Sequence, residues 1–239
     1  MKTFISAPFG NYIKSKNCIS VTGTWTFQPR GNRVLAVAKS LRYNTKFRGW
    51  TNKLGLPNPG ILVGTKKTKE HEIISVAQVE DGDFKKLFNN IWSHQNVEIN
   101  LSCPNILEAG TWSDAKMFLN GSRDWCIAKV SPLISLEEIE YLIDDLGFTQ
   151  IHFSNTLPLS TFNRFSGGGL SGPMLRPYTM ELIKLTRRRF GDKITIIAGG
   201  GIQHVGHVVE YTTAGANHVS LGSVCFHPIK LWKLLKDLR

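Results

Sequence analysis

Short apolar runs recur along the chain at the spacing expected of strands separated by helices. In one of them Val97 and Ile99 alternate with Glu98 and Asn100, which is the period of two that a strand shows. The other runs are also rich in β-branched residues. Together they predict eight strands, at residues 18–22, 34–39, 72–78, 97–101, 126–130, 150–154, 194–198 and 218–222.

Segments of helical periodicity lie between several of these runs and after the last one. They cover residues 83–95, 135–147, 177–191, 202–216 and 228–239. Strands that alternate with helices imply parallel β-α units, and eight such units predict an α/β fold, a (β/α)8 TIM barrel in a single domain. An open doubly wound sheet is the alternative, and it is disfavoured because no G-x-G-x-x-G follows the first run.

Two connections depart from a regular barrel. Residues 23–33, "GTWTFQPRGNR", contain Pro and Gly and are too short for a good helix. Residues 40–60, "SLRYNTKFRGWTNKLGLPNPG", are predicted to form a long loop, and long loops at such places are usually functional.

The composition is that of a soluble globular protein, with 41% hydrophobic and 20% charged residues among 239. No apolar run approaches the roughly 18 residues that a membrane span needs, and residues 1–17 lack the apolar centre of a secretory signal. The four cysteines are far apart with no C-x-x-C spacing, which predicts reduced thiols in the cytoplasm. His204 and His207 match no zinc pattern, so no metal site is predicted.

The formal net charge is +11, from 29 Lys and Arg against 18 Asp and Glu. Such an excess attracts phosphates and other anions, including nucleic acid, without specifying which.

In a barrel the active site lies at the carboxyl ends of the strands. The predicted strands are apolar, but their ends are polar, glycine-rich or cationic, at residues 38–40, 100–105, 128–132, 154–156, 198–202 and 221–223. The glycines of "AGGGI" (198–202) and "LGS" (221–223) can bring several backbone N–H groups to one point near a helix start. This arrangement predicts a phosphorylated ligand.

Other residues at these ends suit a polar ligand. Lys39 and Lys129 follow apolar stretches where an unpaired ammonium would be costly, so each is expected to meet an anionic group, with snorkelling to the rim as the alternative. Cys103 follows a strand and is either a buried small residue or a reactive thiol. Four asparagines offer the donors and acceptors that a planar ring with amide and carboxylate groups requires: Asn58, Asn100, Asn105 and Asn155.

The motifs "NLSCPN", "LGLPNPG", "AKVSP", "SNT", "GGLSG", "AGGGI" and "LGS" occur in the order and context seen in dihydroorotate dehydrogenases. The resemblance spans nearly the whole chain. The cysteine of "NLSCPN" resembles the soluble class, since the membrane-associated class has serine there. The resemblance implies an FMN-dependent barrel that oxidises dihydroorotate to orotate in pyrimidine synthesis.

The resemblance also implies residue roles. Cys103 would be the base that removes the proton from C5 of the substrate while hydride passes from C6 to N5 of the flavin. The four asparagines would hold the substrate ring and its carboxylate, and Ser102 is a weaker candidate for a polar contact. Lys39, counted as catalytic, and Ser40 would flank flavin and substrate, and Lys129 would lie near N1 and O2 of the flavin. The further FMN contacts would be Thr22, Gly23, Asn100, Gly172, Gly200, Gly201, Gly222 and Ser223.

Some features depart from the family. The chain is tens of residues shorter than is usual, and residues 42–53 lack the family's "NPREGN"-like sequence. Residues 106–118 replace a Gly/Pro-rich stretch, so the family's lid over Cys103 is not identified in this sequence. The electron acceptor is not specified: fumarate, a quinone, or NAD through an iron–sulfur partner subunit would all serve. A homodimer and a complex with an electron-transfer subunit are the two assemblies implied.

Two other classes of function stay open. A flavin-dependent reductase of another pyrimidine, including uracil in tRNA, is favoured by the net charge of +11. It is disfavoured by the four asparagines and by the lack of a separate helical RNA-binding domain, so nucleic acid is not predicted as a partner. A noncatalytic flavin- or phosphate-binding protein, or a partner-dependent subunit, is disfavoured by the retained cysteine and lysines.

Overall fold

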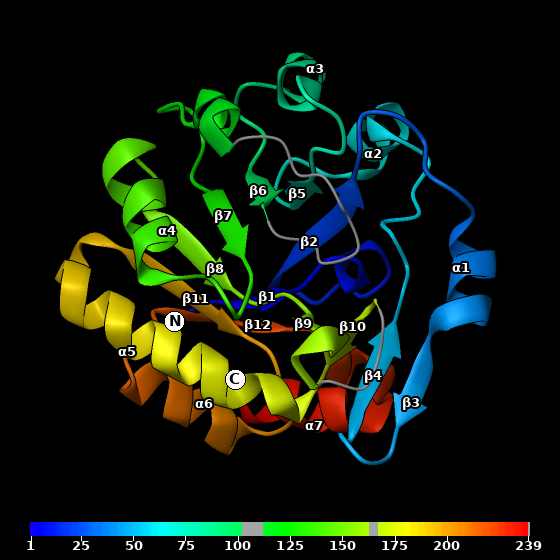
Figure 1. Cartoon of the computed structure of the whole chain (residues 1–239), viewed down its shortest axis with the longest axis vertical. Coiled ribbons are helices and arrows are strands. Elements are labelled where there is room, and N and C mark those ends of the chain that lie inside the picture. Colours follow the sequence, from blue (N-terminus) through cyan, green and yellow to red (C-terminus); the bar gives the residue numbers. More distant parts are fainter. Residues whose placement is uncertain (102–111, 163–166, 239) are drawn as a thin grey trace.

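Eight parallel strands close into a barrel in a computed structural model that describes residues 1–101, 112–162 and 167–238. The strands follow one another around the barrel in the order β1-β12-β11-β8-β7-β6-β5-β2. Their bounds are β1 (Thr3–Ile5), β2 (Cys18–Trp25), β5 (Ile73–Val76), β6 (Val97–Asn100), β7 (Cys126–Val130), β8 (Gln150–Phe153), β11 (Thr195–Gly199) and β12 (His218–Leu221). The predicted (β/α)8 barrel is confirmed, and Figure 1 shows its strands at the centre with helices around them.

The predicted helical segments after the third run are confirmed as α3 to α7. The helix bounds are α1 (Arg33–Ser40), α2 (Ile61–Lys67), α3 (Asp83–Asn89), α4 (Leu136–Glu140), α5 (Arg176–Phe190), α6 (Val205–Thr213) and α7 (Pro228–Asp237). A capping box starts α4, because the Ser135 hydroxyl accepts from the Glu138 N–H while the Glu138 carboxylate accepts from the Ser135 N–H. Among the described helices none is long and apolar enough to cross a membrane.

One of the eight strand predictions is wrong. Residues 34–39 belong to α1, which Asn32 caps by accepting from the Leu35 N–H at 3.1 Å. The helix lies at the outer edge of the molecule, with Val34 79% exposed (Figure 1). A short apolar run cannot by its period alone be assigned to strand or helix, and here the cap favours the helix.

The barrel is completed instead by β1, which has three residues and pairs with both β12 and β2. So short a segment carries too few positions for a periodic signal. Its assignment depends on the two neighbouring strands, whose edges it covers.

The long loop predicted at residues 40–60 contains two antiparallel strands, β3 (Arg42–Asn44) and β4 (Gly49–Asn52). They join β10 (Gly169–Ser171) and β9 (Leu157–Pro158) in a separate four-stranded sheet of order β3-β4-β10-β9. Part of residues 40–60 therefore forms two strands of a sheet, although the sequence predicts only a loop there.

The inside of the barrel changes from apolar to polar along the strands. Ile73 and Ile127 belong to an inner apolar cluster. Ser75 and Lys129 follow them by two residues, so they face the same way one step nearer the carboxyl ends. Polar groups buried inside the barrel are therefore concentrated toward the end at which a barrel carries its site.

Candidate functional site

A cavity of about 210 Å³ opens at the carboxyl ends of the strands. Its barrel wall comes from the ends of β1, β2, β6, β7, β8, β11 and β12. The lining residues from these ends are Ser6, Ala7, Pro8, Gly23, Thr24, Asn100, Lys129, Ser154, Asn155, Thr156, Gly200, Gly222 and Ser223.

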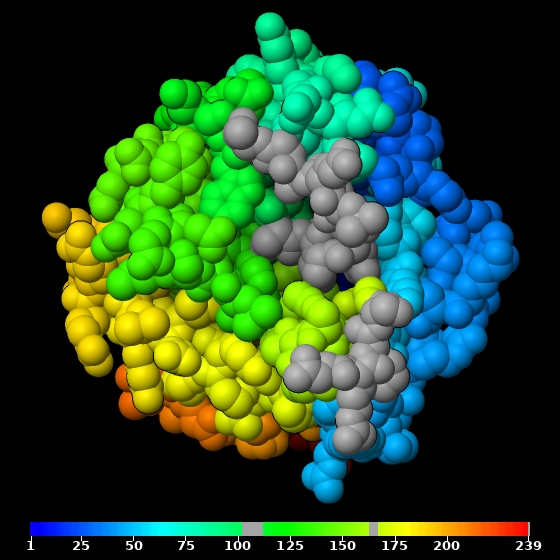
Figure 2. Space-filling model, in the orientation of Figure 1, coloured from blue at the N-terminus to red at the C-terminus, as the bar shows by residue number. Residues whose placement is uncertain are grey.

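The rest of the wall lies outside the barrel. Trp50 and Asn52 of β4 and Ser171 of β10 line the cavity, so the four-stranded sheet forms one side of it. Arg33 and Val37 of α1 contribute another part. Figure 2 shows this face, where amino-terminal segments in blue and cyan meet central segments in green and carboxyl-terminal segments in yellow.

Two predicted site asparagines contact each other in the cavity wall. The Asn155 Nδ2 donates to the Asn100 Oδ1 at 3.0 Å, and the Asn100 Nδ2 donates to the Thr24 Oγ1 at 3.4 Å. The Thr24 and Ser75 hydroxyls lie 3.0 Å apart. This hydrogen-bonded chain fixes both amides at the ends of β6 and β8.

Beneath the asparagines, Lys129 is held by a fully buried carboxylate. Its Nζ lies 3.6 Å from the Glu98 Oε1, which also accepts from the Ser75 hydroxyl at 2.9 Å. Burial would raise the pKa of Glu98, but the Lys129 charge and hydrogen bonds from His152 and Ser75 outweigh it and lower that pKa to about 2. Glu98 is therefore a stable counter-ion that keeps an ammonium at the cavity.

His152 completes this group from β8, with its Nδ1 2.7 Å from the Glu98 Oε2. Burial lowers the pKa of His152 despite that carboxylate, which favours the neutral ring. Because the ionised Glu98 can only accept, the ring hydrogen lies on Nδ1 and forms the hydrogen bond to Glu98. The His152 Nε2 is buried and has no partner among the described residues. Gly199 lies beside this nitrogen, and a Cβ there would lie 3.1 Å from the His152 Nε2 and only 2.5 Å from the Ser154 Cβ, so the Ser154 side chain is what excludes a larger residue.

Glycine backbones form the opposite part of the wall. Gly200 has a φ of +86° and its carbonyl accepts from the Tyr211 hydroxyl at 2.7 Å. A Cβ on Gly222 would meet only the Ser6 Oγ, at 3.8 Å, so the backbone there stays open to the cavity. Exposed peptide groups after β11 and β12 suit a phosphate, and the buried ammonium suits an anionic ring edge. The donor set therefore fits a phosphorylated flavin.

The structure brings most predicted residues together. Those that line the cavity are Gly23, Asn100, Lys129, Asn155, Gly172, Gly200, Gly222 and Ser223. Ser102, Cys103 and Asn105 lie outside the described residues.

The structure does not bring Lys39 and Ser40 to the cavity wall. Both lie on α1, where Lys39 is exposed and the Ser40 hydroxyl donates to the Ala36 carbonyl at 2.9 Å. The expectation that Lys39 follows a strand is wrong, because residues 34–39 form a helix. The buried lysine of the cavity is Lys129.

Three more predicted residues are engaged elsewhere. The Asn58 side chain donates to Leu56 and accepts from the Thr26 and Gly60 N–H groups, so it holds its own loop. The Thr22 hydroxyl lies 2.6 Å from that of Thr68, on the outer side of the barrel. Gly201 packs against Arg176, whose Cγ would lie 2.7 Å from a Cβ there.

Sequence reasoning missed several residues of the site. Ser6 and Pro8 follow β1, and the run "FISAP" ends in Ser and Pro as "INLSCP" does, which could have marked a strand end. Glu98 and His152 gave no such signal, because an alternating polar residue in a strand is ordinarily assigned to the solvent side.

A closed barrel with a buried ammonium, paired amides and open glycine backbones at its carboxyl end defines the class of (β/α)8-barrel proteins with a polar ligand site at that end. The family model for dihydroorotate dehydrogenase matches residues 12–237. The chain belongs to the dihydroorotate dehydrogenase family, and it is a flavin-dependent oxidoreductase.

Similar proteins agree with this assignment. The catalytic subunit of dihydroorotate dehydrogenase B (NAD(+)) from Thermotoga petrophila is 30% identical over 249 residues, which cover 92% of this chain and 88% of that protein. Dihydroorotate dehydrogenase A (fumarate) from Limosilactobacillus reuteri is 28% identical over 222 residues, which cover 80% and 71%. The crystal structure of DHODH in complex with ferulenol from Eimeria tenella has a TM-score of 0.78 at 17% identity, over 100% of this chain and 80% of that one.

Proposed function

We propose that the chain oxidises dihydroorotate to orotate in pyrimidine biosynthesis, with FMN bound at the carboxyl end of the barrel. The contact of Asn100 with Asn155 beside the buried Lys129 carries this proposal. It gives neighbouring amides and a cation at one cavity wall, which suits a pyrimidine ring with a carboxylate next to an electron-accepting ring.

The cofactor would be held by both parts of the wall. The peptide groups of Gly200, Gly222 and Ser223 would meet its phosphate, and Lys129 would stabilise negative charge at its ring edge. FMN, when bound, supplies the hydride acceptor for C6 of the substrate. Glu98 would hold the Lys129 ammonium in place through the 3.6 Å pair.

Asn100 and Asn155 would bind and orient the substrate. The Asn100 Nδ2 has a second hydrogen besides the one directed at Thr24, and an amide donor of this kind suits a ring carbonyl or a carboxylate. The bond between the two amides would fix their orientation before the substrate arrives.

Cys103 would take the proton from C5, a role that rests on the family resemblance of "NLSCPN". The thiolate is the basic form, and a free cysteine has a pKa of about 8.5, so the rate should rise toward alkaline pH.

We also propose a cytoplasmic setting, because Cys18, Cys126 and Cys225 are free thiols.

The reduced cofactor needs an electron acceptor. Relatives named for NAD(+) and for fumarate both match the chain. We propose that the chain assembles with a partner. One candidate is an electron-transfer subunit, as the name "catalytic subunit" of the first relative suggests. The other is a second copy of the chain, which would form a homodimer.

Product analysis tests the proposed reaction. The purified protein, loaded with FMN and mixed with excess dihydroorotate without an acceptor, should form about one orotate per bound flavin. Absence of orotate while FMN stays bound would exclude this substrate.

A further inference from the structure

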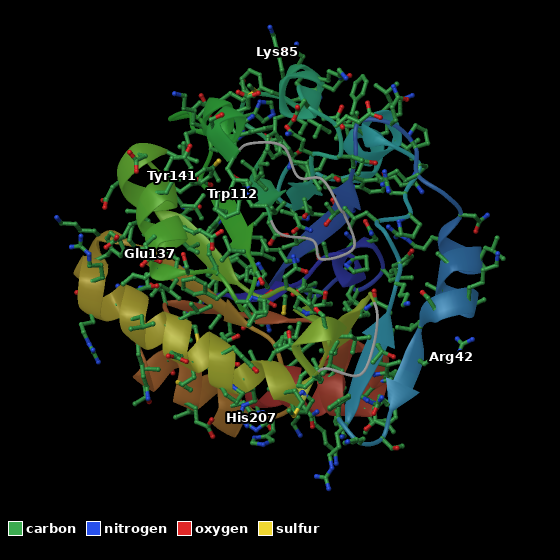
Figure 3. All side chains as sticks on the ribbon, viewed as in Figure 1. Arg42, Lys85, Trp112, Glu137, Tyr141 and His207 are labelled. Atoms are coloured by element: carbon green, nitrogen blue, oxygen red, sulfur yellow. The ribbon has the colours of Figure 1, made fainter. Side chains whose placement is uncertain are left out.

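Of the seven histidines, all of which lie in the described part of the chain, His152 alone is buried. It is 1% exposed and belongs to β8, whereas His207 lies at the edge of the molecule (Figure 3). Its register partner on β7 is Lys129, the residue proposed to lie at the flavin edge. The proposed reaction gives this enclosed titratable ring no role.

The charged groups that face the ring come from two strands. The Glu98 carboxylate of β6 lies 2.7 Å from the His152 Nδ1, and the Lys129 ammonium of β7 lies 3.6 Å from the same carboxylate. Strand β11, which flanks β8 on the other side, has no titratable residue. His218 of β12 lies at the amino end of the barrel, where it accepts from the Lys2 N–H at 3.1 Å. One carboxylate and one ammonium therefore balance each other around the ring.

The Nε2 of His152 is free to accept a proton. It has no partner among the described residues, so protonation there breaks none of their hydrogen bonds and keeps the bond to Glu98. The Ser154 Oγ and this Nε2 lie 2.4 Å and 3.1 Å from one point, the position of a Cβ on Gly199. Because Ser154 lines the main cavity, its hydroxyl offers a proton a route to the ring, directly or through one water.

Reduction of the flavin would upset the charge balance of this group. Glu98 is ionised, Lys129 is charged, and His152 is neutral because burial lowers the pKa of its ring. Dihydroorotate would give its C5 proton to the base and a hydride to the flavin, whose ring edge thereby gains one negative charge. One ammonium would then face two anions, and unbalanced buried charge is costly.

We propose that His152 is a positioning residue that takes up one proton at Nε2 when the flavin is reduced. The proton comes from solvent through the cavity. The charged ring then pairs with Glu98, which leaves the Lys129 ammonium for the flavin edge. When the two electrons pass to the acceptor, the hydrogen gained by the flavin leaves as a proton and His152 returns its own to solvent. The inference rests on the proposed place of the flavin beside Lys129, but not on the identity of the substrate.

Potentiometry of the FMN-loaded protein, with dithionite as the reductant, tests the inference. The pH dependence of the flavin midpoint potential gives the number of protons taken up with the two electrons. We expect about one proton more in the parent than in His152→Asn between about pH 6 and 8. The Asn Nδ2 can replace the ring Nδ1 as donor to Glu98, so the variant loses the titrating nitrogen and keeps the donor. The matched control, His218→Asn, should keep the pH dependence of the parent.

NMR of the parent with isotope-labelled histidine rings detects the same proton without a variant. The bond to Glu98 protects the Nδ1–H of His152 from exchange, which identifies its signal. At neutral pH the Nε2 should carry no proton in the flavin-free protein or with oxidised flavin, and should be protonated once dithionite has reduced the flavin.

Either of two outcomes would overturn the inference: equal pH dependence in the parent and His152→Asn, or an unprotonated Nε2 beside reduced flavin. Flavin reduction by dihydroorotate is measured on the same preparations. Proton uptake by His152 in a protein that dihydroorotate does not reduce would contradict the proposed function and leave the inference standing. Reduction by dihydroorotate without this uptake would do the reverse.

Discussion

At the residue scale, the site depends on a buried chain of polar groups that links Ser75, Glu98, His152 and Lys129. Each partner is fixed by another: Glu98 accepts from Ser75 and from His152 and pairs with Lys129. Charges buried in this way are costly unless every one is paired, so removal of one member affects the others.

Replacing Glu98 by Gln should therefore lower the free energy of unfolding by about 3 kcal/mol, because it leaves the Lys129 ammonium buried without its counter-ion. Urea denaturation at neutral pH measures the change. The control is Glu70→Gln, whose side chain is 83% exposed and which should change stability by less than about 0.5 kcal/mol. Similar losses in both variants would contradict the account of the buried group.

The same carboxylate predicts a pH dependence of stability. Its pKa is lowered from 4.5 to about 2 in the folded protein, so the stability it contributes is present above pH 4.5 and is lost as pH falls toward 2. The stability of Glu98→Gln should change less than that of the parent over this window. Parallel curves for the two proteins would show that Glu98 does not carry the effect.

Cys103→Ala should keep FMN and reduce the rate of flavin reduction by dihydroorotate by about 10²–10⁴-fold, because the variant lacks the base. In the parent the rate should rise with pH through the thiol pKa, about 8.5 for a free cysteine. Stopped-flow absorbance measures both. Cys18→Ala is the control, since it removes a half-buried thiol that does not line the cavity. A Cys103→Ala protein reduced as fast as the parent would exclude the base role.

Residue types at strand ends predicted much of the site. Asn100, Lys129, Asn155 and Gly200 were located from local patterns, because a barrel gathers its strand ends at one place. The assignment of Lys39 to the site was wrong, because it assumed that residues 34–39 form a strand, whereas they form a helix. The inward orientation of Glu98 also follows from barrel closure and not from its neighbours in sequence.

At the element scale, the four-stranded sheet β3-β4-β10-β9 determines how the cavity is covered. It unites residues 42–52 with residues 157–171, which are distant in sequence. Their pairing could not be predicted, because antiparallel contacts between remote short segments leave no periodic signal in either one. The strand β1 was missed for a different reason, because its three residues are too few to show a period of two.

Gly172→Ala should destabilise this sheet. The residue has a φ of +141°, and a Cβ there would lie 2.9 Å from the Gly49 Cα of β4. We expect a loss of about 1–3 kcal/mol and weaker FMN binding, because Gly172 also lines the cavity. Chemical denaturation and a fluorescence titration with FMN measure the two effects. Gly121→Ala, where nothing lies within 4 Å, should behave like the parent, and unchanged values in Gly172→Ala would refute the packing argument.

At the scale of the whole molecule, the barrel closes through β1, and its inward residue Phe4 connects the closure to the inner apolar layer. Phe4 is 1% exposed and packs edge-on against Trp125 with ring centroids 5.1 Å apart. The alternation of strands and helices predicts the fold class, and seven of the eight predicted strands belong to the barrel. The eighth prediction, residues 34–39, is a helix, and β1 is recognised as the closing strand only from its pairing with β12 and β2.

Phe4→Ala should lower the free energy of unfolding by about 3–5 kcal/mol, because it opens a cavity in the layer that supports the polar groups of the site. Urea unfolding measures this. Ile229→Ala truncates an apolar side chain that is 74% exposed and should cost less than about 0.5 kcal/mol. A small loss for Phe4→Ala would mean that β1 does not hold the barrel closed.

The central claim is that this member of the dihydroorotate dehydrogenase family binds FMN and reduces it with dihydroorotate. An anaerobic absorbance spectrum of the FMN-loaded protein, recorded before and after addition of dihydroorotate, tests it most directly. The account predicts that the flavin absorbance band at about 450 nm bleaches, because dihydroorotate reduces the flavin. A bound flavin whose band is unchanged by dihydroorotate would contradict the proposed substrate, and failure to bind FMN would contradict the proposed cofactor.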